Sequence, residues 1–305
     1  MPRLTVIEPG MQTTVQDLGR PGYASLGVPI GGAADALALR AGNRLLGNGE
    51  GAAGLECTLI GPTVVFDEDV EVAVTGARPA GGHPVWQTCR VRRGELLRVG
   101  PLGGGARCYL CVAGGVLVAP LLASASTLVS AGFGGHEGRA LRAGDRLELG
   151  PAGAGLSDTR MADDLRVPAA AAVHVIRATD GAHSFLLADQ PDEFWTSTFT
   201  VSNQSNRVGL RLEGAAISGT DSGEMISEGA MPGAVQVPPA GRPIVLGVEH
   251  PTTGGYPIIA CVASVDMHLL GQVRPGDRVR FERISITAAR AAYLEREARW
   301  STRQP

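Results

Sequence analysis

The stretch Gly144-Asp145-Arg146-Leu147-Glu148-Leu149 returns near the end of the chain as Gly276-Asp277-Arg278-Val279-Arg280-Phe281. In both copies a glycine and an acidic residue make a turn, and charged and apolar residues then alternate as in a strand with one buried face. A third copy is Gly94-Glu95-Leu96-Leu97-Arg98-Val99. We interpret the first two stretches as the closing strands of two similar halves, since recurring motifs indicate duplication.

Short runs with β-type composition fill most of the chain, and only a few segments have helical periodicity. The pattern therefore predicts a mainly β fold with a few helices. We expect an N-terminal half over residues 1–155 with one helix near 34–46, a C-terminal half over 165–286, and a terminal helix and tail over 287–305. The boundary is placed in residues 150–167, which are rich in Gly, Ala, Asp and Ser.

Composition excludes several classes of function. The net charge of −3 does not favour binding to nucleic acid or to an anionic membrane. All 27 basic residues are arginines, so no Walker A lysine, Schiff-base lysine or biotinylated lysine exists. The odd count of 5 cysteines, with no signal-peptide pattern, indicates a reducing cytoplasm. Neither the cysteines nor the 6 scattered histidines form a metal-binding motif, so we expect no metal.

Two polar loops stand out from the apolar background. The first runs from Pro9 to Tyr23 and the second from Thr252 to Pro257. Both place hydroxyl groups beside glycines, whose exposed N–H groups can surround the oxygens of a small carboxylate or amide. The alternative is a pair of turns capped by Thr and Asp side chains.

An ordered series of motifs gives the chain a family resemblance along nearly its whole length. The motifs include the first loop, Gly27–Asp35, Ala41–Asn48, Leu55–Pro62, Val112–Gly115, Ser124–Thr127, Gln204–Gly214, Pro232–Pro238, the second loop and Arg274–Asp277. Together they resemble the biotin-dependent carboxyltransferase-like family, which includes the C subunit of 5-oxoprolinase, allophanate hydrolase subunit 2 and Kip-type antagonists. The resemblance implies two related halves with cyclophilin-like β-barrels.

The resemblance also implies function. It indicates a cytoplasmic subunit of an ATP-dependent 5-oxoprolinase-type complex that opens 5-oxoproline to glutamate, with ATP shared with partner subunits. The implied partners are a protein like the B subunit (similar to allophanate hydrolase subunit 1) and a protein like the A subunit. One alternative is a component that moves a carboxyl group from carboxybiotin, carried on another chain, to urea or a similar amide. A second alternative is a non-catalytic regulatory protein of the Kip type.

Three departures from the family pattern put the usual substrate in doubt. They are Ala125 where relatives carry arginine, Arg177-Ala178-Thr179 in place of a Pro-Gly-Pro turn, and Glu249-His250-Pro251 before the second loop.

Site residues are expected in both polar loops and near two of the later motifs. As catalytic residues we predict Asp17, Arg20 and Glu249. As substrate-binding residues we predict Thr13, Thr14, Gln16, Asn206, Arg207, Gln236, Thr252, Thr253 and Tyr256. Alternatives remain open: Asp17 and Arg20 can tie a turn as a structural pair, and Asn206 and Arg207 can belong to a loop at the barrel edge that pairs with Glu213 or Asp221. We also expect the two polar loops to line one pocket.

Overall fold

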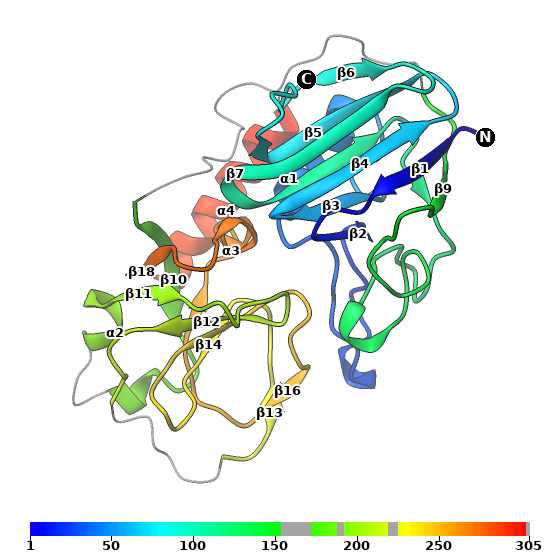
Figure 1. The fold of residues 1–305 in the computed structure, drawn as a ribbon. Helices are drawn as coiled ribbons and strands as arrows, with labels where there is room; N and C mark the ends of the chain where they lie inside the picture. The colour runs from blue at the N-terminus through cyan, green and yellow to red at the C-terminus, as the bar shows by residue number, and fades with distance from the viewer. Residues whose placement is uncertain (154–171, 188–191, 219–224, 303–305) are drawn as a thin grey trace. The chain divides into compact units, whose positions relative to one another are not determined.

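A computed structural model of the chain describes residues 1–153, 172–187, 192–218 and 225–302 (Figure 1). These residues form two compact units. Unit 1 holds residues 1–20 and 31–153, and unit 2 holds residues 21–30 together with the described residues from 172 onward. Most of the sequence boundary predicted at 150–167 lies outside the described residues.

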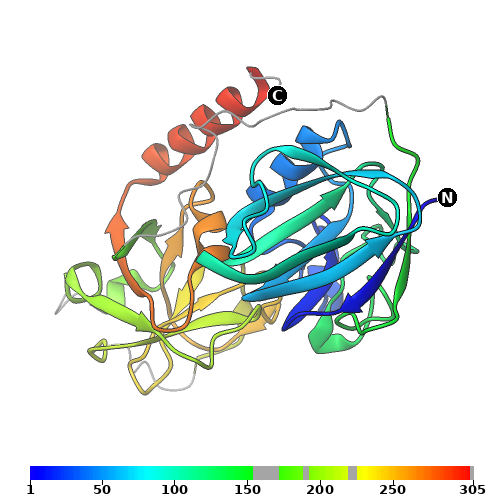
Figure 2. The same cartoon turned by 45° about the horizontal axis from the view of Figure 1, so that its top comes forward.

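Unit 1 is built on a nine-stranded sheet in the order β2-β3-β7-β4-β1-β9-β8, with β5 paired to β7 and to β6. The strands are β1 (Arg3–Glu8), β2 (Gln12–Gln16), β3 (Gly54–Thr58), β4 (Ile60–Phe66), β5 (Val70–Pro79), β6 (Thr88–Val91), β7 (Leu96–Val112), β8 (Val116–Leu117) and β9 (Arg146–Leu149). Helix α1 (Ala36–Leu45) packs against β5 and β7 (Figure 2). The core of the sheet is apolar and mainly aliphatic, with Phe66 among its side chains.

Unit 2 is a closed barrel in the order β10-β17-β14-β15-β12-β11-β18, which β10 and β18 complete by pairing in parallel. Its strands are β10 (His174–Asp180), β11 (Thr198–Val201), β12 (Gly209–Glu213), β14 (Ala234–Gln236), β15 (Ile244–Leu246), β17 (Ile258–Val262) and β18 (Arg278–Arg283). A small ribbon joins β13 (Glu228–Gly229) and β16 (Thr253–Gly254). In the core of this unit, the rings of Phe194 and Phe281 stack with centroids 4.8 Å apart.

The helices follow the sequence predictions closely. Helix α1 begins after Asp35, whose carboxylate accepts a hydrogen bond from the N–H of Ala38 and caps the helix. Helix α4 (Ile286–Thr302) also lies where the sequence places it, and Ser285 caps it by accepting a hydrogen bond from the N–H of Ala288. A short helix, α2, spans Glu193–Thr196. Helix α3 (Met267–Gln272) was missed, because six residues carry little periodicity. None of the described helices is long and apolar enough to cross a membrane.

The repeated turns have the same hydrogen bonds in both units. In unit 1 the N–H of Arg142 donates to the carboxylate of Asp145, and in unit 2 the N–H of Arg274 donates to Asp277 in the same way. In each turn the backbone N–H of the aspartate also donates to the carbonyl of the arginine, from Asp145 to Arg142 and from Asp277 to Arg274. Gly144 and Gly276 have φ values of 90° and 87°, a region that favours glycine. The two turns therefore have the same geometry, and β9 and β18 directly follow them. That these strands close two similar halves stays a prediction.

Acid unfolding is expected to report on the first of these turns. Arg139 hydrogen-bonds the Asp145 carboxylate and lowers its pKa to about 2. Because the pKa of Asp145 is lower in the folded protein than its ordinary value of 3.8, the ionised carboxylate stabilises the fold at pH values above 3.8. This contribution to stability is lost as the pH falls toward 2. Asp145→Asn should therefore flatten the loss of stability between about pH 4 and pH 2, measured by chemical denaturation at each pH. The matched variant Glu148→Asn, on the exposed side of β9, should keep the wild-type slope.

Candidate functional site

The first polar loop begins in β2, whose side chains from Thr13 to Gln16 are buried. The hydroxyl of Thr13 donates to the carbonyl of Pro9 at 2.6 Å. The amide nitrogen of Gln16 donates to the Thr14 hydroxyl and to the carbonyl of Thr127, each at 3.0 Å. The amide oxygen of Gln16 is also buried, and within the described residues no donor reaches it. A buried acceptor of this kind is available to a donor from a ligand or a water molecule.

Asp17 follows β2 and fastens the loop to the distant segment Ser124–Ser126. Its carboxylate accepts hydrogen bonds from the N–H of Gly19 at 2.7 Å, the N–H of Ala125 at 2.6 Å, and the hydroxyls of Ser124 and Ser126. Four donors from the chain surround the two oxygens, so this carboxylate is held in a fixed orientation. The arrangement favours a positioning role, and the catalytic role of Asp17 stays a prediction.

Arg20 is buried beside the same segment. Its guanidinium donates to the carbonyl of Ser126 and lies over the ring of Phe133, 5.1 Å from the centroid. A Cβ atom added at Gly134 would lie 2.9 Å from one terminal nitrogen of Arg20, and a Cβ at Gly31 would lie 3.0 Å from the other. The two glycines therefore make room for the guanidinium. Asp17 and Arg20 both hold Ser126, which supports the structural reading of this pair.

A second buried polar cluster in unit 1 was missed by the sequence predictions. The hydroxyl of Tyr109 donates to Glu56 at 2.7 Å, and Arg107 lies 3.3 Å from the other oxygen of Glu56. Glu56 also accepts the N–H of Ala34, and the Tyr109 oxygen accepts the N–H of Asp35. Burial, and then the charge of Glu56, raise the pKa of Tyr109 well above its usual value. The cluster fixes the start of α1, and register between β3 and β7 brings it together.

The cysteines near this cluster are buried in the core. Burial raises the pKa of Cys111, and the hydrogen bond with Cys57 followed by burial raises the pKa of Cys108. Thiols with raised pKa values are poor nucleophiles and poor metal ligands. Among the described residues, no group of three or more His, Cys, Asp or Glu side chains could hold a metal ion.

In unit 2 the predicted residues Arg207 and Glu249 face each other. The Nε of Arg207 lies 2.5 Å from a carboxylate oxygen of Glu249, and both side chains are almost fully buried, with exposed fractions of 5% and 3%. The N–H of Glu249 also donates to the carbonyl of Arg207 at 3.0 Å. Arg207 thus pairs with Glu249, and within the described residues it forms no ion pair with the alternative partner Glu213. The other alternative partner, Asp221, lies outside the described residues. The neighbouring Asn206 is exposed, and its side-chain oxygen accepts the N–H of Val208.

The second polar loop lies at the ribbon of β13 and β16. Thr253 is in β16 and is exposed, as is Tyr256, whereas Gln236 in β14 is buried. A Cβ added at Gly254 would lie 2.7 Å from the amide nitrogen of Gln236, so this glycine allows the amide to approach the loop. The carbonyl of Thr252 accepts the N–H of Ala230, which holds the ribbon at its base.

The predicted site residues are thus divided between the two units. Asp17, Arg20 and the side chains of β2 lie in unit 1, whereas Asn206, the Arg207–Glu249 pair, Gln236 and the second loop lie in unit 2. The pocket shared by the two loops stays a prediction.

Each of the three sequence departures contains a residue with a structural role, and that of Glu249 is its ion pair with Arg207. The N–H of Ala125 donates to Asp17, which needs no particular side chain at this position. Arg177 forms a two-point ion pair with the buried Asp266, with its Nε 2.9 Å from one oxygen. Arginine at this position therefore links β10 to the start of α3.

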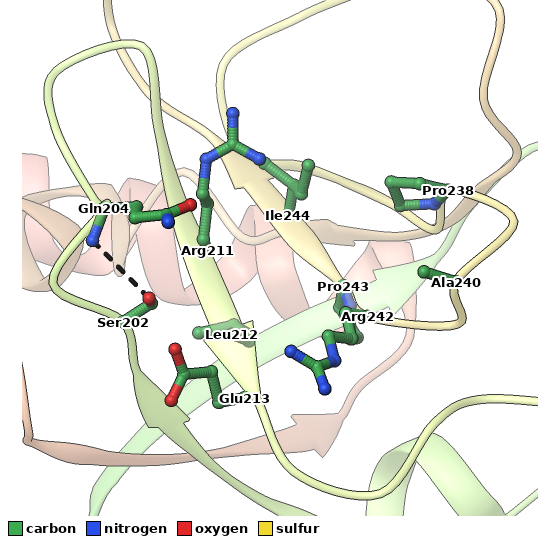
Figure 3. A pocket seen from close by; sticks show the side chains of 10 residues that line it. All are labelled: Ser202, Gln204, Arg211, Leu212, Glu213, Pro238, Ala240, Arg242, Pro243 and Ile244. Carbon is green, nitrogen blue, oxygen red and sulfur yellow. Dashed lines mark hydrogen bonds between the residues drawn. The ribbon is translucent and has the colours of Figure 1, made fainter.

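A pocket of about 250 Å³ in unit 2 involves residues that the sequence predictions did not select. Figure 3 shows Arg211, Glu213 and Arg242 around it. The signal was present in the alternation of β12, where charged Arg211 and Glu213 alternate with buried Leu210 and Leu212. It was not used because the same pattern is typical of an ordinary solvent-facing barrel surface.

Comparison with known proteins gives full-length matches. The chain is 41% identical to the C subunit of 5-oxoprolinase from Escherichia coli over 301 residues, which cover 96% of this chain and 95% of that protein. It is 36% identical to the protein of the same name from Haemophilus influenzae, with 94% and 93% covered.

A solved structure, that of the K. lactis urea amidolyase, aligns with a TM-score of 0.90 at 28% identity. The alignment covers 97% of this chain but only 19% of that much longer protein. The family described as "Carboxyltransferase domain, subdomain A and B" matches residues 26–283. This chain belongs to that carboxyltransferase domain family.

Proposed function

We propose that this chain is the C subunit of a 5-oxoprolinase complex, which uses ATP to open 5-oxoproline to glutamate. The observation that carries the proposal is the 41% identity to the C subunit from Escherichia coli across 95% of that protein's length. A match that covers both chains almost completely indicates that the two proteins have the same parts in the same order. We place the complex in the cytoplasm, in keeping with unpaired cysteines.

The chemistry of this reaction sets what the site must supply. The lactam oxygen is activated as a phosphate ester or a similar species, and water then attacks the carbon. Donors must stabilise the developing oxyanion, and cations must hold the phosphate groups. In unit 1, Thr14 and Gln16 offer a hydroxyl and an amide, and the buried acceptor of Gln16 suits the lactam N–H.

ATP is assigned mainly to the partner subunits. The chain has no lysine. Its buried arginine at the first loop, Arg20, already donates to the Ser126 carbonyl and lies over Phe133. The buried Arg207 is likewise engaged with Glu249. Because both arginines are already engaged in the protein, these contacts support assigning the ATP phosphates to the partners, which are proteins like the A and B subunits. The role left for this chain is to bind 5-oxoproline and to assemble the complex.

The test is an assay of the chain alone and of the chain co-expressed with proteins like the A and B subunits. The isolated chain should neither hydrolyse ATP nor open 5-oxoproline, whereas the co-purified complex should form glutamate at an enzymatic rate of about 1 per second or more, only when ATP is present. Size-exclusion chromatography should show this chain co-eluting with the protein like the B subunit. Turnover by the isolated chain, or separate elution at micromolar concentration, would contradict the proposal.

Carboxyl transfer is the second candidate, favoured by the TM-score of 0.90 to urea amidolyase. In this reaction the chain would move a carboxyl group from carboxybiotin on another chain to urea or a similar amide. Supplying the complex with a carboxylated biotin carrier and urea distinguishes the two candidates, because only carboxyl transfer consumes carboxybiotin. A complex that carries out neither reaction would indicate the Kip-type regulatory role.

A further inference from the structure

The pocket of about 250 Å³ in unit 2 lies on the outer face of the barrel, beside β12 and β15. The orientation follows from alternation along β12, where the side chains of Leu210 and Leu212 join the barrel core and those of Arg211 and Glu213 are exposed. Apolar groups of Pro238, Ala240 and Pro243 line the pocket beside them. Its volume is below the roughly 300–1,000 Å³ typical of sites for drug-sized molecules, and it suits a smaller ligand.

Strand register brings three charged side chains to this pocket. Arg211 pairs with Ile244 across β12 and β15, and the N–H of Leu212 donates to the carbonyl of Pro243 one step further along. Glu213 and Arg242 follow on the two sides of this pairing and line the same pocket. Figure 3 shows the guanidinium groups of Arg211 and Arg242 on different sides of the pocket, with Glu213 below Leu212.

These three charges are not neutralised within the described part of the chain. Within the described residues, the guanidinium groups of Arg211 and Arg242 and the carboxylate of Glu213 form no ion pair and no hydrogen bond. This contrasts with Arg139, Arg177 and Arg207, each of which is paired with a carboxylate. Two positive groups and one negative group thus surround an apolar surface of small area.

We propose that this pocket binds a small acidic amino acid. Such a ligand carries two carboxylates and one ammonium group, which complement the two arginines and the one glutamate of the pocket. Each carboxylate would pair with Arg211 or Arg242, and the ammonium group with Glu213. The short aliphatic part of the ligand would lie against Pro238, Ala240 and Pro243. Binding at this pocket depends only on its own charges and shape, so it is tested separately from the proposed function.

The expected affinity is weak because all three charged side chains are exposed to solvent. Exposed ion pairs contribute little each, and a few of them give a Kd of about 1–10 mM. The test is a titration of the full chain with L-glutamate and, separately, with glutarate, which lacks the ammonium group. Binding is followed by NMR chemical-shift changes, and L-glutamate should bind about 5-fold more tightly than glutarate.

Three variants separate the parts of the site. Arg211→Gln and Arg242→Gln should each weaken L-glutamate binding by about 5-fold. Glu213→Gln should weaken L-glutamate binding and leave glutarate binding unchanged or tighter, since it removes only the partner of the ammonium group. The matched control is Arg278→Gln, an exposed arginine on β18, which should bind as the wild type does. Thermal melts of each variant establish that it is folded.

Several results would overturn the proposal. One is the lack of saturable L-glutamate binding up to about 50 mM. Another is Glu213→Gln weakening both ligands equally, and a third is Arg278→Gln weakening binding as much as the two pocket arginines do. In the last case the binding would be a general attraction of anions to the barrel surface.

Discussion

Replacing Arg207 by methionine is expected to lower the free energy of unfolding by about 3–5 kcal/mol, because the variant leaves the buried Glu249 carboxylate without its cation. Both side chains are almost fully buried, so water cannot take the place of the lost guanidinium. Urea denaturation followed by circular dichroism measures the change. The exposed Arg278→Met serves as the matched control and should change stability by no more than about 0.5 kcal/mol.

The double variant Arg207→Met with Glu249→Leu sharpens this prediction. Removing both charges removes the uncompensated carboxylate, so the double variant should be more stable than Arg207→Met alone. If the single variant loses less than about 1 kcal/mol, or if the double variant is no more stable than the single one, the ion pair does not hold the fold. A loss of complex activity with unchanged stability would instead support the substrate-binding role predicted for Arg207.

The architecture could be predicted from local patterns where those patterns are complete. Alternation after a Gly-acid turn identified β9 and the first part of β18. Within strand β7, residues 100–105 contain four glycines and lack alternation, so local composition does not predict a strand there. In the structure β4 pairs with Gly100 and Pro101, and β5 pairs with Leu102 and Gly103, so the strand continues through this stretch. The continuity of β7 is set by pairing with distant strands and cannot be read from its local composition.

The site residues could be selected by type, but their surroundings could not. The sequence singled out Arg207 and Glu249 as polar residues near family motifs, yet only the barrel register shows that they bury each other. Likewise, the partners of Asp17 in the segment Ser124–Ser126 lie 107 to 109 residues away in sequence. When the tertiary fold brings a side chain to its partners, the residues next to it in sequence do not indicate which partners these are.

Replacing Asp17 by asparagine is expected to lower the free energy of unfolding by about 2–3 kcal/mol, since hydrogen bonds to a charged group are worth about 1.5–3 kcal/mol each. The wild-type carboxylate accepts four hydrogen bonds, from Gly19, Ser124, Ala125 and Ser126. An amide has one oxygen and one NH₂ group, and every one of these partners approaches as a donor. Whichever way the amide turns, a backbone N–H or a serine hydroxyl faces another donor.

The measurement that decides the role of Asp17 combines stability with turnover. Glu148→Gln, the same change of a carboxylate to an amide at an exposed position of β9, is the matched control and should alter stability by about 0.5 kcal/mol or less. A positioning role predicts that Asp17→Asn loses stability and that the folded fraction retains partner binding. Unchanged stability with complex activity reduced by roughly tenfold or more would contradict that role, because a general base can be lost without any cost to the fold.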